Sequence, residues 1–384
     1  DSEQRETTDL IPKAEEIIEP SNQIEIFYDS IVESRVFSYY LPSGLKSKDG
    51  FAAVIFFDPQ GDGTQPLSRY AEMANNLDLL LIGSSVSQNG LTMDVISDHY
   101  QNLIQTLRSN FQGSSGKIIL AGFSGGAKVA TDFGLSDPAA IGVVATGAML
   151  DPKERRPNMP LVLIAGKGDL NHQSMLLSSL ELMQQKRQVM FQQFKGTHEW
   201  CPHVLMENSL RWILQKQGMI KLEDRLSAFY EAESNLSGLT GLDEFIALQA
   251  VNTAFGDLGE IASLRFRLVE IANSGLLSKE LNALYERSDS EEAMKQQYSE
   301  QLQNVDLVWW KTEISRLKML ANGESEKAFQ AQRLLGFIGL YCYMISDKML
   351  LQPGNDPSGI IEVYLLVEPD NPEAQRIKAE LSAL

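Results

Sequence analysis

Residues 117–136 read KIILAGFSGGAKVATDFGLS, and this stretch decides the fold. It begins with an apolar run typical of a buried strand, turns through Gly122-Phe123-Ser124-Gly125-Gly126, and continues with a segment that suits a helix. A Gly-x-Ser-x-Gly pattern alone is weak evidence, but strand, tight turn and helix together are the setting of a nucleophile elbow. Gly122 and Gly126 fit that turn because it leaves no room for a Cβ atom. The pattern predicts a Ser124 hydroxyl lifted clear of a strand end, with a simple packing corner as the alternative.

Short apolar runs alternate with amphipathic segments throughout the first half of the chain. Strands are expected at 24–30, 35–41, 52–57, 79–84, 117–122, 141–147, 160–166 and 188–194, and helices at about 65–77, 94–110, 125–136, 173–186 and 202–217. From residue 52 onward the strands are nearly continuous in Val, Ile, Leu and Phe, the pattern of parallel strands buried on both faces. We therefore expect an α/β fold with a doubly wound, mostly parallel sheet and right-handed crossovers.

The character of the sequence changes after residue 217. No proline occurs between Pro202 and Pro353, strand-like runs disappear, and apolar residues recur at helical spacing. The second half is therefore predicted to be all-helical. The expected parts are a mobile acidic leader at 1–20, the α/β domain at 21–217 and the helical domain at 218–384.

The end of the chain reads IIEVYLLVEPDNPEAQRIKAELSAL. Two prolines separate two helical segments here, and Asn371 is a candidate cap for the second. The arrangement resembles the end of a tetratricopeptide repeat (TPR). An irregular helical bundle is the alternative, because no clean period of about 34 residues is found.

Composition excludes several classes of function. The formal net charge is −18 and no basic run is longer than Arg155-Arg156, so we expect no nucleic-acid partner. No stretch approaches the roughly 18 uninterrupted apolar residues of a membrane-spanning helix, so a transmembrane protein is not expected. Cys201 and Cys342 lack metal-ligand spacing, which predicts two buried free thiols and no metal site. The acidic leader after Asp1 favours an exported protein (periplasmic, lipoprotein-like or secreted) over a trimmed cytoplasmic one.

A serine hydroxyl becomes an effective nucleophile when a base removes its proton. All four histidines lie in the α/β part of the chain. His198 is the preferred base because it follows the last predicted strand, within FKGTHEW, and precedes the last helix of the domain. His99 and His203 are expected to decorate helices, and His172 is close to the predicted acid.

The base needs a carboxylate to fix its tautomer and to stabilise the imidazolium. Asp169, in LIAGKGDLNH, comes directly after one predicted strand, and Asp151 follows the preceding strand. We prefer Asp169 and keep Asp151 as the alternative acid, with a helix N-cap as the other role open to either. The chain order Ser124, Asp169, His198 is that of the α/β-hydrolases.

The oxyanion that forms when Ser124 attacks needs preorganised N–H donors. The backbone of Gly125, directly after the nucleophile, is the first candidate. The second is expected from the loop DPQGDG, which follows the strand predicted at 52–57.

Four short motifs in this order resemble the α/β-hydrolase superfamily, within it the carboxylesterases and the dienelactone-hydrolase-like serine hydrolases. DPQGDG is similar to the HGxGDxG loop, GFSGGA to the GFSxGG elbow, and GKGD and GTHEW to the acid and histidine loops. The resemblance covers about half of the chain and implies a catalytic triad of Ser124, His198 and Asp169, with Gln60 as the second oxyanion donor. The chain departs from it at Asp58-Pro59, where the family has His-Gly. Pro59 has no N–H, and Asp58 brings a carboxylate near the expected oxyanion.

We therefore predict a serine esterase that forms an acyl-enzyme and needs no cofactor. Its substrate would be a small-molecule ester or acyl compound, with amides left open because fold does not fix substrate. The alternative is a non-catalytic binding or scaffold protein that engages a protein partner through its helical domain. The large helical half and the unusual Asp58-Pro59 motivate that alternative.

Three further features each have two interpretations. Ser87, Gln88 and Asn89 follow a strand and either contact substrate or form an ordinary polar turn, and the turn is preferred. Trp200 either walls the pocket or belongs to the core. The pair Trp309-Trp310 either packs against the α/β domain or fills the helical core, and core packing is preferred.

Overall fold

The computed structural model describes residues 21–29, 34–47, 50–111, 114–153, 155–350 and 356–382. The predicted leader, residues 1–20, lies outside these ranges. By the density of its internal contacts the chain divides between Ile119 and Leu120 into two compact units, and each is described by itself. The eight strands follow the order β1-β2-β4-β3-β5-β6-β7-β8 in the sheet, which confirms the predicted α/β fold.

The first unit contains the antiparallel edge of the sheet and its first parallel pair. Its elements are β1 (Ile24–Asp29), β2 (Ser34–Tyr40), the 3₁₀ turn η1 (Ser43–Ser47), β3 (Phe51–Phe57), α1 (Thr64–Leu77), β4 (Leu79–Ser84), α2 (Met93–Asn110) and the start of β5 (Ser114–Phe123). Strand β2 pairs antiparallel with β1 and β4, whereas β3 and β4 are parallel, with Phe57 opposite Ser84. Every residue of β3 and β4 is buried, as their continuous apolar sequences predict.

The second unit begins with the parallel strands that carry the candidate site. Its elements up to residue 216 are α3 (Gly125–Ser136), β6 (Ala140–Thr146), β7 (Leu161–Gly166), α4 (His172–Gln184), β8 (Val189–Phe194) and α5 (His203–Lys216). Strands β6, β7 and β8 run parallel, with Val143 opposite Leu161 and Leu161 opposite Val189. The carboxyl ends of these strands therefore meet at one edge, where the loops that follow them come together.

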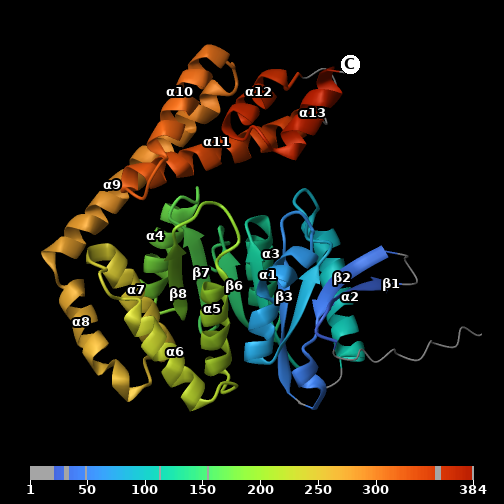
Figure 1. The fold of residues 1–384 in the computed structure, drawn as a ribbon, viewed down its shortest axis with the longest axis vertical. Coiled ribbons are helices and arrows are strands. Elements are labelled where there is room, and N and C mark those ends of the chain that lie inside the picture. Colours follow the sequence, from blue (N-terminus) through green and yellow to red (C-terminus); the bar gives the residue numbers. More distant parts are fainter. Residues whose placement is uncertain are drawn as a thin grey trace, which may run out of the picture. The chain divides into compact units, whose positions relative to one another are not determined.

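After Phe194 the described residues form helices and no further strand. These are α6 (Leu222–Ser234), α7 (Gly241–Phe255), the short η2 (Gly259–Ile261), α8 (Ala262–Ala272), α9 (Gly275–Gln301), α10 (Leu307–Leu320), α11 (Glu326–Leu350), α12 (Ser358–Val367) and α13 (Pro372–Ser382). Figure 1 shows them in yellow to red, after the blue and green strands. The α6 and α9 helices were not singled out in the sequence. Both carry long polar faces that weaken their apolar periodicity.

Three apolar clusters lie in the described helical region, and α9 belongs to two of them. Near the start of α9, Leu277 packs with residues of α7 and α8, and near its end Tyr298 packs in a larger core of α10 to α13. A helix of 27 residues spans about 40 Å, so α9 joins these two cores. Trp310 is fully buried in the larger core, which confirms the preferred core-packing interpretation of the tryptophan pair.

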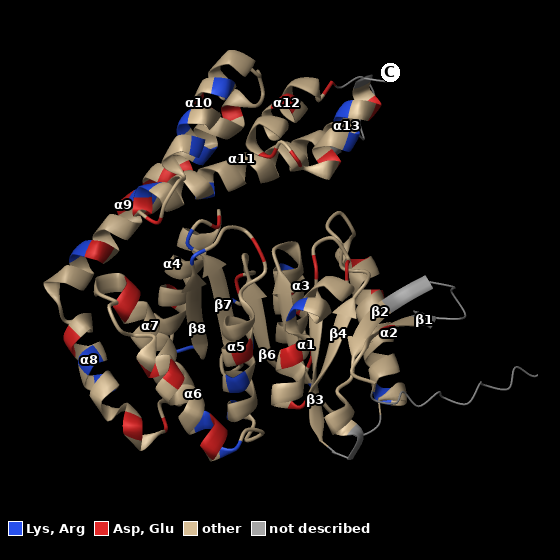
Figure 2. Cartoon of the chain, in the orientation of Figure 1, with Lys and Arg blue, Asp and Glu red and all other residues tan. Residues whose placement is uncertain are grey.

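The predicted cap at the last helix is present. The Asn371 side-chain oxygen accepts from the N–H groups of Glu373 and Ala374, each at 3.1 Å, directly before α13. The tetratricopeptide resemblance of this region stays a prediction. Figure 2 shows Lys and Arg interspersed with Asp and Glu along the helices, so the acidic excess is not confined to one segment. Within the described ranges, no helix has the length and apolar character needed to cross a bilayer.

The helical region shares its compact unit with the strands from Leu120 onward. Helix α7 contacts β8, α9 contacts α4, and the Trp212 indole of α5 donates to the Thr253 carbonyl of α7 at 3.1 Å. The sequence places a domain boundary at 217/218, where strands give way to helices. The helices thus pack directly on this half of the sheet, and the predicted domain bounds stay a prediction.

Candidate active site

The turn between β5 and α3 holds Ser124 in a strained conformation. β5 ends at Phe123, α3 begins at Gly125, and Ser124 between them has φ 52° and ψ −121°. A positive φ is uncommon for a residue with a Cβ atom and persists only where the surroundings enforce it. The Ser124 N–H donates to the Thr146 carbonyl at 2.9 Å, and its own carbonyl accepts from Ala127 N–H at 3.0 Å. These bonds lock the turn that presents the hydroxyl.

Close packing across the turn explains the first glycine of the elbow motif. A Cβ on Gly122 would lie 2.2 Å from the Gly126 carbonyl oxygen, so no larger residue fits there. Gly126 lies in the first turn of α3 and is buried. Both glycines thus let strand and helix approach closely, as a sharp elbow requires.

Three predicted side chains form a hydrogen-bonded row within the second unit. The His198 Nε2 lies 2.9 Å from Ser124 Oγ, and its Nδ1 lies 3.0 Å from Asp169 Oδ2. The Asp169 side chain is 1% exposed and that of His198 is 19% exposed. The loops that follow β5, β7 and β8 supply the three residues, so the parallel strands bring together positions far apart in sequence.

The hydrogen bonds of this row define which nitrogen of His198 carries a proton. An ionised carboxylate only accepts, so Asp169 selects the tautomer in which His198 Nδ1 carries the proton. Nε2 is then free to accept from the Ser124 hydroxyl. Asp151, the alternative acid, lies on the surface, where its Oδ1 accepts from Lys153 N–H at 2.8 Å.

Two residues that were not singled out in the sequence complete the support of Asp169. The Asn171 N–H donates to Asp169 Oδ1 at 2.8 Å, and the Asn171 amide donates to the Gly147 carbonyl at 2.8 Å. Gly147 has φ +68°, and a Cβ there would lie 3.0 Å from Asp169 Oδ2 and 3.2 Å from His198 Cε1. The position of Gly147 directly after β6 is the sequence signal that would have drawn attention to it.

The loops that carry the acid and the histidine are bonded to each other. The Lys167 N–H donates to the Phe194 carbonyl and the Gly168 N–H to the Gly196 carbonyl, both at 2.8 Å. A Cβ on Gly166 would lie 2.4 Å from the Gly196 oxygen, so the two backbones are in direct contact. This contact fixes the separation of Asp169 and His198.

Aromatic rings surround the histidine on one side. The Phe123 ring lies 4.8 Å from the His198 ring and 5.6 Å from the Trp200 ring, measured between centroids. Trp200 is 3% exposed, so it belongs to the core behind the site. Phe123, which precedes the nucleophile, therefore lies close to both rings.

The two predicted oxyanion donors have different local surroundings. Gly125 is the first residue of α3, so its N–H is among the helix N-terminal donors that have no partner within the helix. Gln60 lies in the first unit, where its N–H donates to Asp58 Oδ1 at 2.8 Å. The Asp58 side chain thus takes up the very N–H that the family resemblance assigns to the oxyanion.

The polar turn after β4 supports the loop that contains Gln60. Ser87 is buried and its hydroxyl donates to the Asp58 carbonyl at 3.1 Å, while Asn89 N–H donates to the Pro59 carbonyl at 2.7 Å. Gln88 and Asn89 have exposed side chains. These bonds accord with the preferred interpretation of Ser87 and Asn89 as parts of a structural turn.

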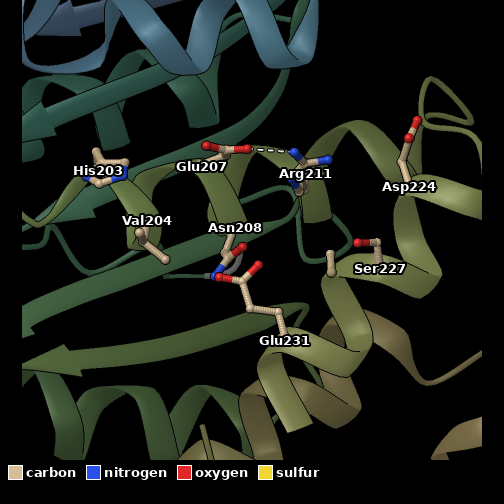
Figure 3. Close-up of a pocket in the computed structure, with 9 residues that line it drawn as sticks. His203, Val204, Glu207, Asn208, Arg211, Asp224, Ser227 and Glu231 are labelled. Atoms are coloured by element: carbon tan, nitrogen blue, oxygen red, sulfur yellow. Dashed lines mark hydrogen bonds and ion pairs between the residues drawn. The ribbon is translucent and has the colours of Figure 1, made fainter. Parts of the chain in front are cut away.

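None of the other three histidines belongs to the hydrogen-bonded row, although the His172 N–H donates to the Asp169 carbonyl at 2.8 Å. His99 is half-buried on α2, and His203 begins α5 and lines a polar hollow of about 290 Å³ between α5 and α6. Figure 3 shows this hollow with the Glu207–Arg211 ion pair along one wall. Burial lowers the pKa of His172 to about 4, and its Nε2 lies 2.9 Å from Gln193 Oε1.

Among the residues that the structure describes, no cluster of three or more His, Cys, Asp or Glu has an arrangement suited to a metal ion. Cys201 and Cys342 are both buried and neither forms a disulfide, as predicted. Burial, with Glu368 adding to it, raises the pKa of Cys342 to about 12.

No family model and no curated protein matches this chain. Solved structures with a similar arrangement include the fluorophosphonate-binding serine hydrolase FphF of Staphylococcus aureus, at 14% identity and a TM-score of 0.40, over 51% of this chain and 99% of that one. S-formylglutathione hydrolase of Agrobacterium tumefaciens gives 13% identity and 0.39, over 52% and 99%. Esterase 2 of Thermogutta terrifontis gives 12% identity and 0.40, over 52% and 96%. Such distant likeness assigns no activity, and it is the chain's own strand order, parallel register and strand-turn-helix elbow that give it the α/β-hydrolase fold, followed by a helical region.

Proposed function

We propose that this protein is a serine hydrolase that cleaves a carboxylic ester, with Ser124 as nucleophile, His198 as general base and Asp169 as the orienting acid. The observation that carries the proposal is the row from Ser124 Oγ through His198 to Asp169, with contacts of 2.9 and 3.0 Å. Nucleophile, base and orienting carboxylate within hydrogen-bond reach are the signature of an activated serine.

The reaction follows from the direction of that row. Ser124 Oγ attacks the ester carbonyl carbon while its proton passes to His198 Nε2, and Asp169 stabilises the imidazolium. The tetrahedral intermediate expels the alcohol, which takes the proton from Nε2 and leaves an acyl group on Ser124. Water then attacks the acyl carbon as Nε2 accepts its proton, and the proton returns to Ser124 Oγ as the acid departs.

The negative charge on the intermediate needs N–H donors. The Gly125 N–H at the start of α3 supplies one, helped by the positive end of the helix dipole. Gln60 as the second donor stays a prediction, and it requires that its N–H leave Asp58 Oδ1. The choice of an ester over an amide rests on the resemblance to carboxylesterases.

The alternative of a non-catalytic scaffold is less well supported. Positive φ at Ser124 and the complete burial of Asp169 both cost folding free energy, which a scaffold would have no reason to retain. Catalysis accounts for both costs together.

Hydrolysis of p-nitrophenyl acetate by the full chain tests the proposal. We expect turnover that falls to the background rate in Ser124→Ala and falls by several orders of magnitude in His198→Ala. His203→Ala is the matched control, because His203 lines the hollow at α5, and it should keep wild-type kcat. Equal activity of the wild type and Ser124→Ala would refute the proposal.

A further inference from the structure

The loop that carries Asp169 is held by the helical region. The Arg333 Nη1 of α11 donates to the Lys167 carbonyl at 2.8 Å, and the Lys295 Nζ of α9 donates to the Leu170 carbonyl at 2.9 Å. These two carbonyls lie on either side of Asp169 in the chain. The turn that holds the candidate acid is therefore hydrogen-bonded at both ends by basic side chains. These side chains lie more than a hundred residues later in the sequence.

A single buried carboxylate links the two cations. Glu291 of α9 accepts from Arg333 Nε at 2.9 Å, and its other oxygen lies 3.4 Å from Lys295 Nζ. Arg333 is 1% exposed and Glu291 is also 1% exposed. The Arg333 Nη2 bonds Glu326 at 2.8 Å, so all three nitrogens of the guanidinium have acceptors. We call Arg333, Lys295 and Glu291 the clamp.

Helix α11 also touches the loop backbone. A Cβ on Gly168 would lie 3.0 Å from the Cβ of Gln332, so the glycine before Asp169 leaves room for the close approach of the helix. Lys167 adds an ion pair with Asp243 of α7 at 2.6 Å. The loop is thus enclosed by side chains of α7, α9 and α11.

A buried ion pair is a poor source of stability, because desolvation of the two charges offsets most of their attraction. It does impose geometry, since a guanidinium satisfies three acceptors only in one orientation. Loops after strands are otherwise mobile, and a catalytic row tolerates displacements of only about half an ångström. A role in fixing the position of Asp169 therefore accounts for the free energy that is lost when the charges of the clamp are buried.

We propose that the helical region acts as a positioning element for the reaction, with Arg333, Lys295 and Glu291 holding the Lys167–Leu170 loop so that Asp169 faces His198 Nδ1. This rests on the proposed function of the Ser124 site. The clamp residues touch neither substrate nor the reacting atoms. They act through the backbone of the acid loop.

The test removes the two fully buried charges of the clamp, Arg333 and Glu291, together. Arg333→Met with Glu291→Leu removes both charges together and with them the bond to the Lys167 carbonyl. The matched control is Arg267→Met with Glu244→Leu, which removes an Arg–Glu pair between α8 and α7 that has no bond to the acid loop. Circular dichroism and thermal unfolding verify that each double variant is folded.

We expect the clamp variant to lose about ten- to a hundredfold in kcat for p-nitrophenyl acetate, with KM within about twofold of the wild type, because a displaced acid impairs the transition state and not binding. Its rate of fluorophosphonate labelling at Ser124 should fall by the same factor. The control should keep wild-type values. A folded clamp variant with wild-type kcat would overturn the positioning role.

A ¹H NMR resonance and a second variant test the clamp independently of the double variant's activity. The proton on His198 Nδ1 that is shared with Asp169 should give a far-downfield ¹H resonance, lost in the clamp variant and retained in the control. This readout is independent of turnover, so an inactive wild type would refute the hydrolase while the resonance still judges the clamp. If the double variant does not fold, Lys295→Met serves in its place. It should lower kcat several-fold, and unchanged kcat there would refute the clamp.

Discussion

Replacing Asp169 with Asn tests the role of the buried acid, because both of its oxygens have fixed partners. Oδ1 accepts from the Asn171 backbone N–H at 2.8 Å, and Oδ2 accepts from His198 Nδ1 at 3.0 Å. An amide has one oxygen and one NH₂ group, so it satisfies only one of the two donors. The backbone N–H cannot change, and the amide oxygen should therefore turn towards Asn171.

In that orientation the NH₂ group donates to His198 Nδ1 and forces the proton onto Nε2. Nε2 then no longer accepts from Ser124. The opposite orientation keeps the right tautomer but sets two donors against each other at Asn171, which costs about 1–3 kcal/mol and reduces the productive state by about 5- to 150-fold. Loss of the carboxylate charge beside the imidazolium removes up to about 4 kcal/mol more.

With the charge effect at its full value the two effects sum to about 5–7 kcal/mol, so we predict that kcat/KM for p-nitrophenyl acetate falls by about a thousandfold or more in Asp169→Asn. Asp151→Asn is the control, since that exposed residue bonds only its own turn in the described structure, and it should keep full activity. Retention of more than about a tenth of wild-type kcat/KM by Asp169→Asn, in a folded protein, would show that Asp169 does not orient the base.

Three other changes have defined outcomes. Gly147→Ala should lower kcat about ten- to a hundredfold, because its Cβ would press on Phe123, Asp169 and His198. Gly218 has a similar φ of +67° and open space around it, so the control Gly218→Ala should leave kcat unchanged. Burial lowers the pKa of His172 to about 4, so the unfolded chain takes up its proton first as the pH falls. The free energy of unfolding should be full above about pH 6.5 and fall by up to about 3 kcal/mol towards pH 4, and urea titrations of His172→Gln should lack this part of the slope. Asn371→Ala removes the cap of α13 and should cost about 1 kcal/mol in the same titrations, and an unchanged midpoint would refute the capping role.

Much of the sheet could be predicted because its strands carry their own signal. Strands β3, β4 and β7 are buried on both faces, so they consist of nearly continuous apolar residues that can be recognised in the sequence. The elbow at Ser124 could also be predicted from the sequence. Its tight turn has no space for a Cβ atom at Gly122, so it requires the glycine of the motif. The order of acid and histidine along the chain follows from the loops after successive parallel strands.

The supports of the site were not predictable in the same way. Gly147 and Asn171 matter because of atoms contributed by other loops, and neither belongs to a motif of its own. The contact between Arg333 and the Lys167 carbonyl joins residues 166 positions apart. Arg333 is one of three basic residues on α11, and its partners are defined only by the packing of the helices.

At Asp58 a local hydrogen bond differs from what the motif implies. The resemblance implies an available N–H at Gln60, but the Asp58 side chain accepts from that N–H in a short local turn. Asp commonly bonds the backbone two residues ahead in this way. The substitution of Asp58 for the family's histidine therefore alters the very donor that the motif is meant to present.

Covalent labelling shows whether Ser124 is an activated nucleophile. The full chain is treated with a fluorophosphonate, and the modified peptide is located by mass spectrometry. We predict a single adduct on Ser124, formed far more slowly in His198→Ala and absent in Ser124→Ala. An unlabelled wild type, beside a control serine hydrolase that is labelled, would contradict the account, and so would an adduct that persists in Ser124→Ala.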